Sequence, residues 1–373
     1  MNERFRNLTG NAALVFGSTL FVFFALEAYL WADSALNALS SHADAVAAPP
    51  SALPAAVENG PYRIPPAVVA RAEARHQVMT MPKEWALREV HIPGAAKAYY
   101  WQGALHVEDE NGFRRSAPFP QKDPNTFRVM VVGDSLTFGL GLEENDTFVA
   151  LLNSWMAKDY RIEFLNLGVV RYQSEDVLRT IRTFLPRLRP DLVLYAVCLN
   201  DFAPSGKGEY HDDDLYQFPL PGRIKRFLIA HTRAGAFLND KYDAALRKVH
   251  LRRDFYDDIL IGFGGYEARF RRDVAEMNRI VTAAGLPPMT AIVVDQNPEF
   301  QGRGYTIARV AEDALTKAGA DVIATEDFYR RYNNRSMYVS SWEGHPNEVA
   351  NYIWAEMILQ RLNQRPDLVR FRR

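Results

Sequence analysis

A serine, a glutamate and a histidine in this chain have the types and the spacing of groups that cooperate in acyl transfer. Ser135 follows a short apolar run, Phe127 to Val132, and is followed by small or flexible residues. Its hydroxyl can act as a nucleophile, and a helix that begins beside it favours negative charge there. Serine is also a common turn or helix-cap residue, so Ser135 alone does not establish a nucleophile.

The base and the acid come from a segment near the C-terminus. His345 precedes Pro346, which suits the first position of a final helix and would leave the histidine at the helix entrance. Glu343, two residues earlier, can orient the imidazole and stabilise its charged form, as the acid of a triad does. The other histidines, from a total of 8, lie outside any comparable group, and an isolated surface histidine is the alternative for each.

Polar residues also follow the next two apolar runs. Asn166 and Gly168 end the second run, and Asn200 follows the third, which ends at Cys198. The amide of Asn200 is a donor suited to an oxyanion. Turn chemistry also favours asparagine and glycine at strand ends, so each of them taken alone is ordinary.

The elements that must bring these residues together alternate from Phe127 onwards. Apolar runs predict strands over 127–132, 161–165, 191–198, 289–295 and 321–324, and amphipathic stretches predict helices over 147–158, 174–188, 266–284, 305–318 and 347–363. This alternation indicates an α/β fold with a parallel sheet covered on both faces. Sites in such sheets lie beyond the carboxyl ends of the strands, which is where the polar residues above are expected.

Composition excludes several other classes of protein. Lys and Arg number 44 against 45 Asp and Glu, so no overall charge attracts nucleic acid, and we expect no nucleic-acid partner. The single cysteine, Cys198, excludes an intrachain disulfide and a multi-cysteine zinc site, and it is expected to be a small buried residue. Phosphate-binding glycine loops and paired-histidine motifs are absent from the sequence, so no cofactor or metal is expected.

The N-terminal region predicts an anchor and a tether. Residues 1–32 hold an apolar run preceded by Arg4 and Arg6, interrupted by Glu27 and long enough for a bilayer-spanning helix with its N-terminus in the cytoplasm. A cleaved signal peptide and a buried core helix are the alternatives. Residues 33–66 are rich in Ala, Pro and Ser and predict a linker.

The rest of the chain divides by composition. Residues 67–125 predict a small antiparallel appendage, and 126–365 the α/β domain, with an amphipathic helical insertion at about 203–262. The insertion carries an acidic run, 211–214, which could hold a cation but is usually only solvated.

The combination of these motifs resembles the SGNH or GDSL-type hydrolases. The resemblance covers about 111–363, and its motifs occur in the family's order: Gly133-Asp134-Ser135-Leu136, Asn166 with Gly168, Asn200 with Asp201, and Glu343-x-His345-Pro346-Asn347, with Asn111 to Arg114 ahead of them as in exported, anchored bacterial members. It implies a flavodoxin-like three-layer α/β/α sandwich.

The resemblance also implies roles for individual residues. Ser135 would be the nucleophile, His345 the general base and Glu343 the acid. The oxyanion would be bound by the Ser135 N–H, the Asn200 side chain and a backbone N–H in the loop that holds Gly168 and Arg171. The family commonly has a second glycine where this chain has Arg171. If the backbone there has positive φ, a non-glycine residue costs about 1 kcal/mol.

Three functions fit these expectations. The first is an esterase on the outer side of the cytoplasmic membrane, facing the periplasm, that removes acyl groups, O-acetyl above all, from carbohydrates or small esters. The second is an O-acyltransferase that passes the acyl group to an envelope polysaccharide. The third is a catalytically weak binding or scaffold module, with Arg171 as the mark of lost chemistry.

Overall fold

The computed structural model of the chain describes residues 17–32, 64–78, 82–204, 222–248, 256, 259–260, 262–295, 303–325, 337–340 and 343–373. The chain forms two compact units. The larger comprises 52–77, 83–210 and 255–373, and the smaller comprises 1–51, 78–82 and 211–254.

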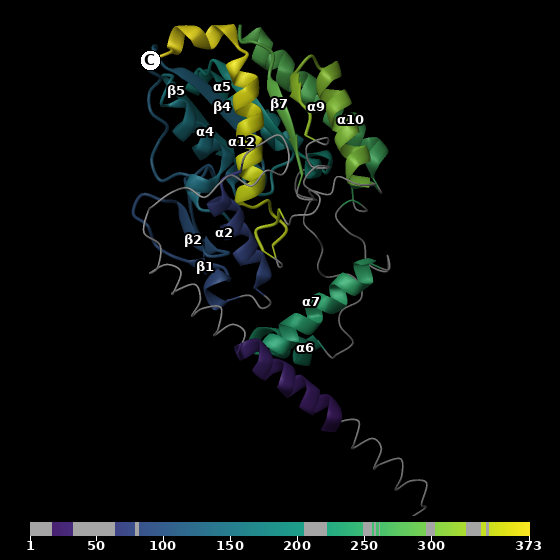
Figure 1. Ribbon diagram of the computed structural model, residues 1–373. Coiled ribbons are helices and arrows are strands. Elements are labelled where there is room, and N and C mark those ends of the chain that lie inside the picture. Colours follow the sequence, from purple (N-terminus) through teal and green to yellow (C-terminus); the bar gives the residue numbers. More distant parts are fainter. Residues whose placement is uncertain are drawn as a thin grey trace, which may run out of the picture. The chain divides into compact units, whose positions relative to one another are not determined.

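A five-stranded parallel sheet forms the centre of the larger unit (Figure 1). Its strands are β4 (Phe127–Gly133), β5 (Ile162–Gly168), β6 (Leu192–Cys198), β7 (Thr290–Val294) and β8 (Asp321–Ile323). They lie in the order β5-β4-β6-β7-β8, which is the doubly wound order of flavodoxin-like sheets. The five expected strands and the parallel sheet are thus confirmed. β4, β6 and β7 are buried along their whole length, as their continuous apolar runs predicted.

Helices cover the sheet as expected (Figure 1). The helices α5 (Ser174–Leu188), α9 (Phe263–Ala283) and α10 (Arg303–Lys317) pack against one another, whereas α4 (Phe148–Met156) and α2 (Pro66–Gln77) pack against α12 (Glu348–Asn363). Side chains fix where these helices begin. The Thr147 hydroxyl accepts the N–H of Ala150 at the start of α4, and the Asp176 carboxylate accepts the N–H of Gln173 at 3.2 Å at the start of α5.

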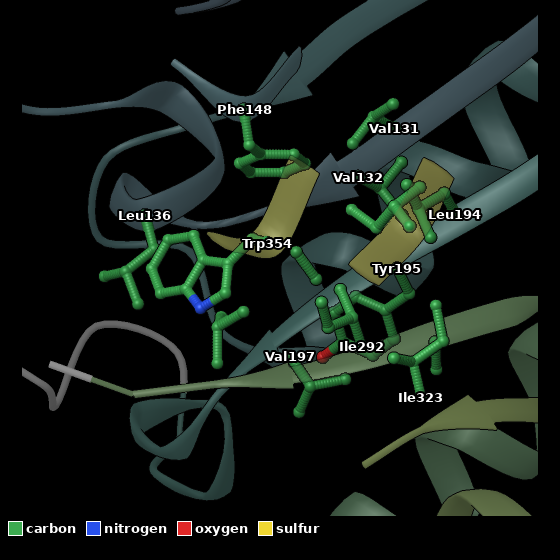
Figure 2. Packing of buried hydrophobic residues seen from close by; sticks show 14 of the residues in the cluster. Val131, Val132, Leu136, Phe148, Leu194, Tyr195, Val197, Ile292, Ile323 and Trp354 are labelled. Carbon is green, nitrogen blue, oxygen red and sulfur yellow. The ribbon is translucent and has the colours of Figure 1, made fainter. Parts of the chain in front are cut away.

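Trp354 of α12 lies at the centre of the hydrophobic core and is fully buried. Its ring meets that of Phe148 edge-on, with 6.1 Å between the centroids. Figure 2 shows Leu136, the residue after Ser135, on the other side of the same indole. The packing of α12 therefore supports the segment that carries the serine.

A second, three-stranded antiparallel sheet precedes the parallel one within the larger unit. It consists of β1 (Arg88–Glu89), β2 (Lys97–Trp101) and β3 (Ala104–Glu108) in that order. The turn between β2 and β3 has two central residues, Gln102 and Gly103, with φ of 53° and 79°. Positive φ at both positions is the type I′ geometry that matches the twist of a tight hairpin.

The smaller unit contains three described helices: residues 17–32, α6 (Gly222–His231) and α7 (Arg233–Lys248). Two of these, α6 and α7, lie in the expected helical insertion. Glu27 caps the start of α7, because its carboxylate accepts the backbone N–H groups of Arg233 and Ala234 at 3.1 and 2.6 Å. It also accepts the indole N–H of Trp31 at 3.0 Å. The charge that interrupts the N-terminal apolar run thus has several partners.

The expected transmembrane helix is not found among the described residues. None of the helices in those ranges combines the length and the apolar character needed to cross a membrane. The first part of the expected anchor, 1–16, most of the expected linker, 33–63, and the acidic run at 211–214 lie outside the described residues.

Candidate active site

Ser135 lies at the carboxyl end of the central strand β4. It begins α3 (Ser135–Phe138), a single helical turn whose N-cap is Asp134, with the Asp134 carboxylate accepting the Leu136 N–H at 2.9 Å. This turn packs very closely on β5: a Cβ placed on Gly168 would lie 2.4 Å from the Phe138 nitrogen. Glycine at 168 therefore lets the serine-bearing turn approach the sheet.

A closed loop before α12 holds Glu343 and His345. The N–H of Val339 donates to the His345 carbonyl and that of Asn347 to the Met337 carbonyl, both at 2.7 Å. The prediction that Pro346 occupies the first position of the final helix is wrong. The helix begins at Glu348, because the Asn347 side chain accepts the first free N–H groups of α12 and acts as its N-cap.

The structure brings Ser135, His345 and Glu343 into one hydrogen-bonded line. Ser135 Oγ lies 2.8 Å from His345 Nε2, and His345 Nδ1 lies 2.5 Å from Glu343 Oε1. Ser135 is 5% exposed, and the His345 and Glu343 side chains are 16% and 13% exposed. A line of hydroxyl, imidazole and carboxylate that remains open to solvent at one edge is the geometry of a catalytic triad.

The electrostatics of the pair suit proton transfer. Burial lowers the pKa of His345, but the hydrogen bond and charge of Glu343, together with the charge of Asp134, outweigh it and raise this pKa above its usual value. Burial raises the pKa of Glu343, yet the hydrogen bond and charge of His345 and the hydrogen bond from Trp101 bring it below its usual value. Glu343 thus remains a carboxylate that stabilises a proton on His345.

Asn200 lies beside this line, at the end of β6. It is part of a short 3-10 helix, Leu199–Phe202, and its side chain counteracts the rise that burial causes in the pKa of Asp134, the residue before Ser135. The side-chain oxygen of Asn200 is buried and has no protein hydrogen-bond partner. The amide of Asn200 is thus a donor near the serine, as an oxyanion site needs.

Cys198 is a buried thiol rather than a reactive one. It is fully buried, and burial raises the pKa of its thiol well above the usual value, with the charges of Asp134 and Asp201 adding to the effect. The expectation of a small buried residue is confirmed.

Arg171 occupies the left-handed backbone conformation that favours glycine. Its φ is 71°, and it is the third residue of a turn closed by the Tyr172 N–H on the Val169 carbonyl at 3.2 Å. The conformation is the one expected from the family's glycine, and an arginine here is strained by about 1 kcal/mol. Gly168, by contrast, uses its N–H on the Asn166 side chain at 3.0 Å. The geometry therefore gives Gly168 a packing role.

Three residues with no role predicted from the sequence contact the catalytic residues or the turn that carries Ser135. The Trp101 indole N–H donates to Glu343 Oε2 at 2.9 Å. Arg114, 5% exposed, donates to the carbonyls of Phe138, Gly139, Leu142 and Leu105 at 2.5 to 3.2 Å. The His106 ring stacks between those of Tyr99 and Phe138.

The only sequence signals for these residues were the aromatic cluster at 99–101 and the motif that ends at Arg114. Arg114 binds the backbone carbonyls at and directly after the end of the serine-bearing turn, which explains why an arginine ends that motif. Among the described residues, no group of three or more His, Cys, Asp or Glu side chains could hold a metal ion.

A parallel α/β sheet with a serine, a histidine and a carboxylate linked at its carboxyl edge defines a serine hydrolase type of site. The model of the GDSL-like lipase/acylhydrolase family matches residues 131–352, more than half of the chain. The chain belongs to this family and is a carboxylic ester hydrolase.

Several solved structures are similar to the chain over its larger part. A crystal structure of TesA is 16% identical with a TM-score of 0.41 and covers 63% of this chain and 97% of its own. The psychrotrophic esterase EstA from Pseudoalteromonas sp. is 14% identical, with a TM-score of 0.40 and coverages of 64% and 97%. An acetylxylan esterase from Geobacillus stearothermophilus, Axe2, is 14% identical, with a TM-score of 0.38 and coverages of 63% and 94%. A search of curated proteins found no match.

Proposed function

We propose that the protein is a serine esterase whose nucleophile is Ser135, with His345 as general base and Glu343 as the acid that orients it. The observation that carries this proposal is the 2.8 Å approach of Ser135 Oγ to His345 Nε2, continued to Glu343. The raised pKa of His345 adds support, because it favours the imidazolium that forms when the serine loses its proton.

The proposed reaction has two halves. Ser135 Oγ attacks the ester carbonyl carbon while its proton passes to His345 Nε2. The C–O bond to the alcohol then breaks, and His345 returns the proton to the leaving alcohol. Water attacks the acyl-enzyme with His345 again taking a proton, the free acid leaves, and the proton returns to Ser135.

The oxyanion of both tetrahedral intermediates is stabilised by the Ser135 N–H and the Asn200 amide in this proposal. Asn200 is favoured because its side chain acts on the pKa of Asp134, the residue next to the serine. The turn that holds Arg171 contributes a backbone N–H, because every residue except proline carries one. Loss of one such donor typically lowers the rate about 10²- to 10³-fold.

A fluorophosphonate probe tests this function directly. We expect it to label the full-length protein at Ser135, as identified by mass spectrometry of the modified peptide. Ser135→Ala should abolish labelling and hydrolysis of 4-nitrophenyl acetate, and His345→Ala should abolish both nearly completely. Hydrolysis that persists in Ser135→Ala would refute the assignment of the nucleophile. A wild-type protein that is neither labelled nor able to hydrolyse the ester would instead leave a binding or scaffold role.

We also propose that the substrates are O-acyl esters, O-acetyl above all, on carbohydrates outside the cytoplasm, and that the N-terminal region tethers the enzyme there. The apolar run up to residue 32 supports the tether, as do the exposed Phe21, Val22 and Phe24 on helix 17–32. The partners of Glu27 reduce the cost of a charge beside that run.

Two measurements test location and substrate. The full chain should sediment with membranes and resist release by high salt, and a version lacking 1–32 should be released. Acetylated glycans incubated with the enzyme should yield free acetate. If the acetyl group instead appears on an added glycan acceptor, the enzyme is an O-acyltransferase.

A further inference from the structure

The tip of the β2–β3 hairpin touches the loop that holds Glu343 and His345. Trp101 is the last residue of β2, and its indole N–H donates to Glu343 Oε2 at 2.9 Å across 242 positions of sequence. The other oxygen of Glu343, Oε1, accepts from His345 Nδ1 and from the His345 backbone N–H at 3.2 Å. The two oxygens of this one carboxylate are therefore held by different segments, Oε2 by the hairpin and Oε1 by His345.

The next residue of the hairpin holds the other end of the same loop. The Gln102 side chain is fully buried, and its oxygen accepts the Ser340 hydroxyl at 2.8 Å. Ser340 and Glu343 are in turn joined by two backbone hydrogen bonds of 3.4 Å. Gln102 has a φ of 53°, a conformation that is unfavourable for a residue with a side chain. Its contact with Ser340 offsets that strain.

We infer that Trp101 is a positioning residue of the active site, which fixes the Glu343 carboxylate so that it orients His345. This inference rests on the proposed function. Both hydrogen bonds from His345 end on Oε1, and a carboxylate held on one oxygen can still turn about its terminal torsion, whereas one held on both oxygens cannot. Trp101 supplies the second hydrogen bond without adding a charge, so Glu343 keeps its full effect on the imidazole.

Alternative roles for Trp101 are less consistent with these contacts. A purely structural tryptophan would pack its ring and leave the N–H on a backbone carbonyl or on water, as indoles usually do. Here the N–H meets the acid of the triad. The N–H of Trp101 is not free to bind substrate, because it is already used on Glu343.

The test is the steady-state kinetics of Trp101→Phe, which keeps an aromatic ring and removes the N–H. We expect kcat for 4-nitrophenyl acetate to fall about tenfold with KM unchanged, the size of effect that one hydrogen bond to a charged group produces. The concentration of active sites is measured by titration with a fluorophosphonate, and kcat is calculated per active site, so that misfolded protein does not lower the value. The matched control is Trp155→Phe, because the Trp155 ring packs on Tyr352 instead; it should keep the wild-type kcat.

A double-mutant cycle shows whether Trp101 acts through Glu343. In a Glu343→Ala background, Trp101→Phe should change kcat less than about twofold. The same tenfold loss in both backgrounds would overturn the inference, and so would a wild-type kcat in Trp101→Phe. Ser340→Ala removes the hydroxyl that Gln102 accepts and leaves the Trp101 indole N–H in place. We expect it to lower kcat a few-fold, and an unchanged kcat there would also count against the inference.

Failure of the inference and failure of the proposed function give different results. If Ser135→Ala remains active, the assignment of Ser135 as the nucleophile is wrong, and Glu343 is then not the acid of a catalytic triad. If Ser135→Ala is inactive and Trp101→Phe is as fast as the wild type, only the role of Trp101 is refuted.

Discussion

Ser135 Oγ and His345 Nε2 lie 2.8 Å apart although 210 positions of sequence separate the two residues. The central strand β4 supplies the serine, and the loop before α12 supplies the histidine. No local preference of either segment produces this contact. It depends on how α12 packs on α4 and on the core around Trp354.

The charge of Glu343 sets the pH dependence of activity. The base must be neutral, so kcat/KM should rise with pH through an apparent pKa above 6.5, because Glu343 raises the pKa of His345. In Glu343→Gln this limb should move to lower pH, and kcat/KM should fall by about 10³-fold or more. Profiles of 4-nitrophenyl acetate hydrolysis from pH 5 to 9 measure both. If the apparent pKa of the profile is the same in Glu343→Gln as in the wild type, Asp134 rather than Glu343 raises the pKa of His345. The control is Glu267→Gln on α9, which should leave the profile unchanged.

Arg114 should be among the most important residues for stability. Arg114→Met leaves buried carbonyl oxygens without donors, and we expect the free energy of unfolding to fall by at least about 3 kcal/mol. Arg115→Met at the next position is the matched control. Arg115 lies over the Phe119 ring at 3.5 Å, a contact worth about 1 kcal/mol. Urea denaturation compares the two, and equal losses would contradict a special role for the carbonyl clamp.

Backbone strain at Arg171 can be measured apart from its side chain. Arg171→Gly and Arg171→Ala both remove the guanidinium, but only glycine relieves the positive φ. The glycine variant should therefore be more stable than the alanine variant by about 1 kcal/mol, a difference of a few degrees in Tm. Equal melting temperatures would show that the turn relaxes without cost.

His106 should make the protein sensitive to acid. Burial, with the charge of Arg114, lowers the pKa of His106 to about 3, and its Nε2 must stay unprotonated to accept the Gly141 N–H. The unfolded chain takes up a proton near pH 6.5 and the folded chain does not, so stability is lost as the pH falls below 6.5. Between pH 7 and 5 the loss should be about 2 kcal/mol.

His106→Gln, which keeps an acceptor for the Gly141 N–H, should show a smaller loss over this range. Thermal melting at pH 7, 6 and 5 measures it. His91→Gln removes an exposed histidine and is the control. If His106→Gln and the wild type lose stability in parallel, other buried groups set the acid sensitivity.

The sequence predicted most of the fold and the centre of the site. Continuous apolar runs specify buried parallel strands, and Ser135 and Asn200 follow two strands whose ends such a sheet must bring to one edge. His345 was placed at the entrance of the final helix. The conformation of Arg171 was stated only as a condition, namely that an arginine is strained there if the family's glycine has positive φ, and the observed φ of 71° meets that condition.

The supporting residues could not be predicted because their partners are distant in sequence. A tryptophan in an aromatic cluster gives no sign that its N–H will meet a carboxylate 242 positions away. The sequence shows Arg114 only as a charged residue, because three of the carbonyl groups that it binds lie 24 to 28 positions further along the chain. The start of α12 was misplaced because Pro346 and Asn347 both suit a helix start, and only the observed side-chain contacts of Asn347 decide between them.

The tight turn at Gln102 and Gly103 has a consequence for how this enzyme can evolve. Surface hairpins usually tolerate extra residues at their tips. One residue added within β2 ahead of Trp101 would turn the indole to the opposite side of the ribbon, since side chains alternate along a strand. A one-residue insertion in β2, far along the chain from the serine, should therefore lower the activity at least as much as Trp101→Phe does while leaving the protein folded.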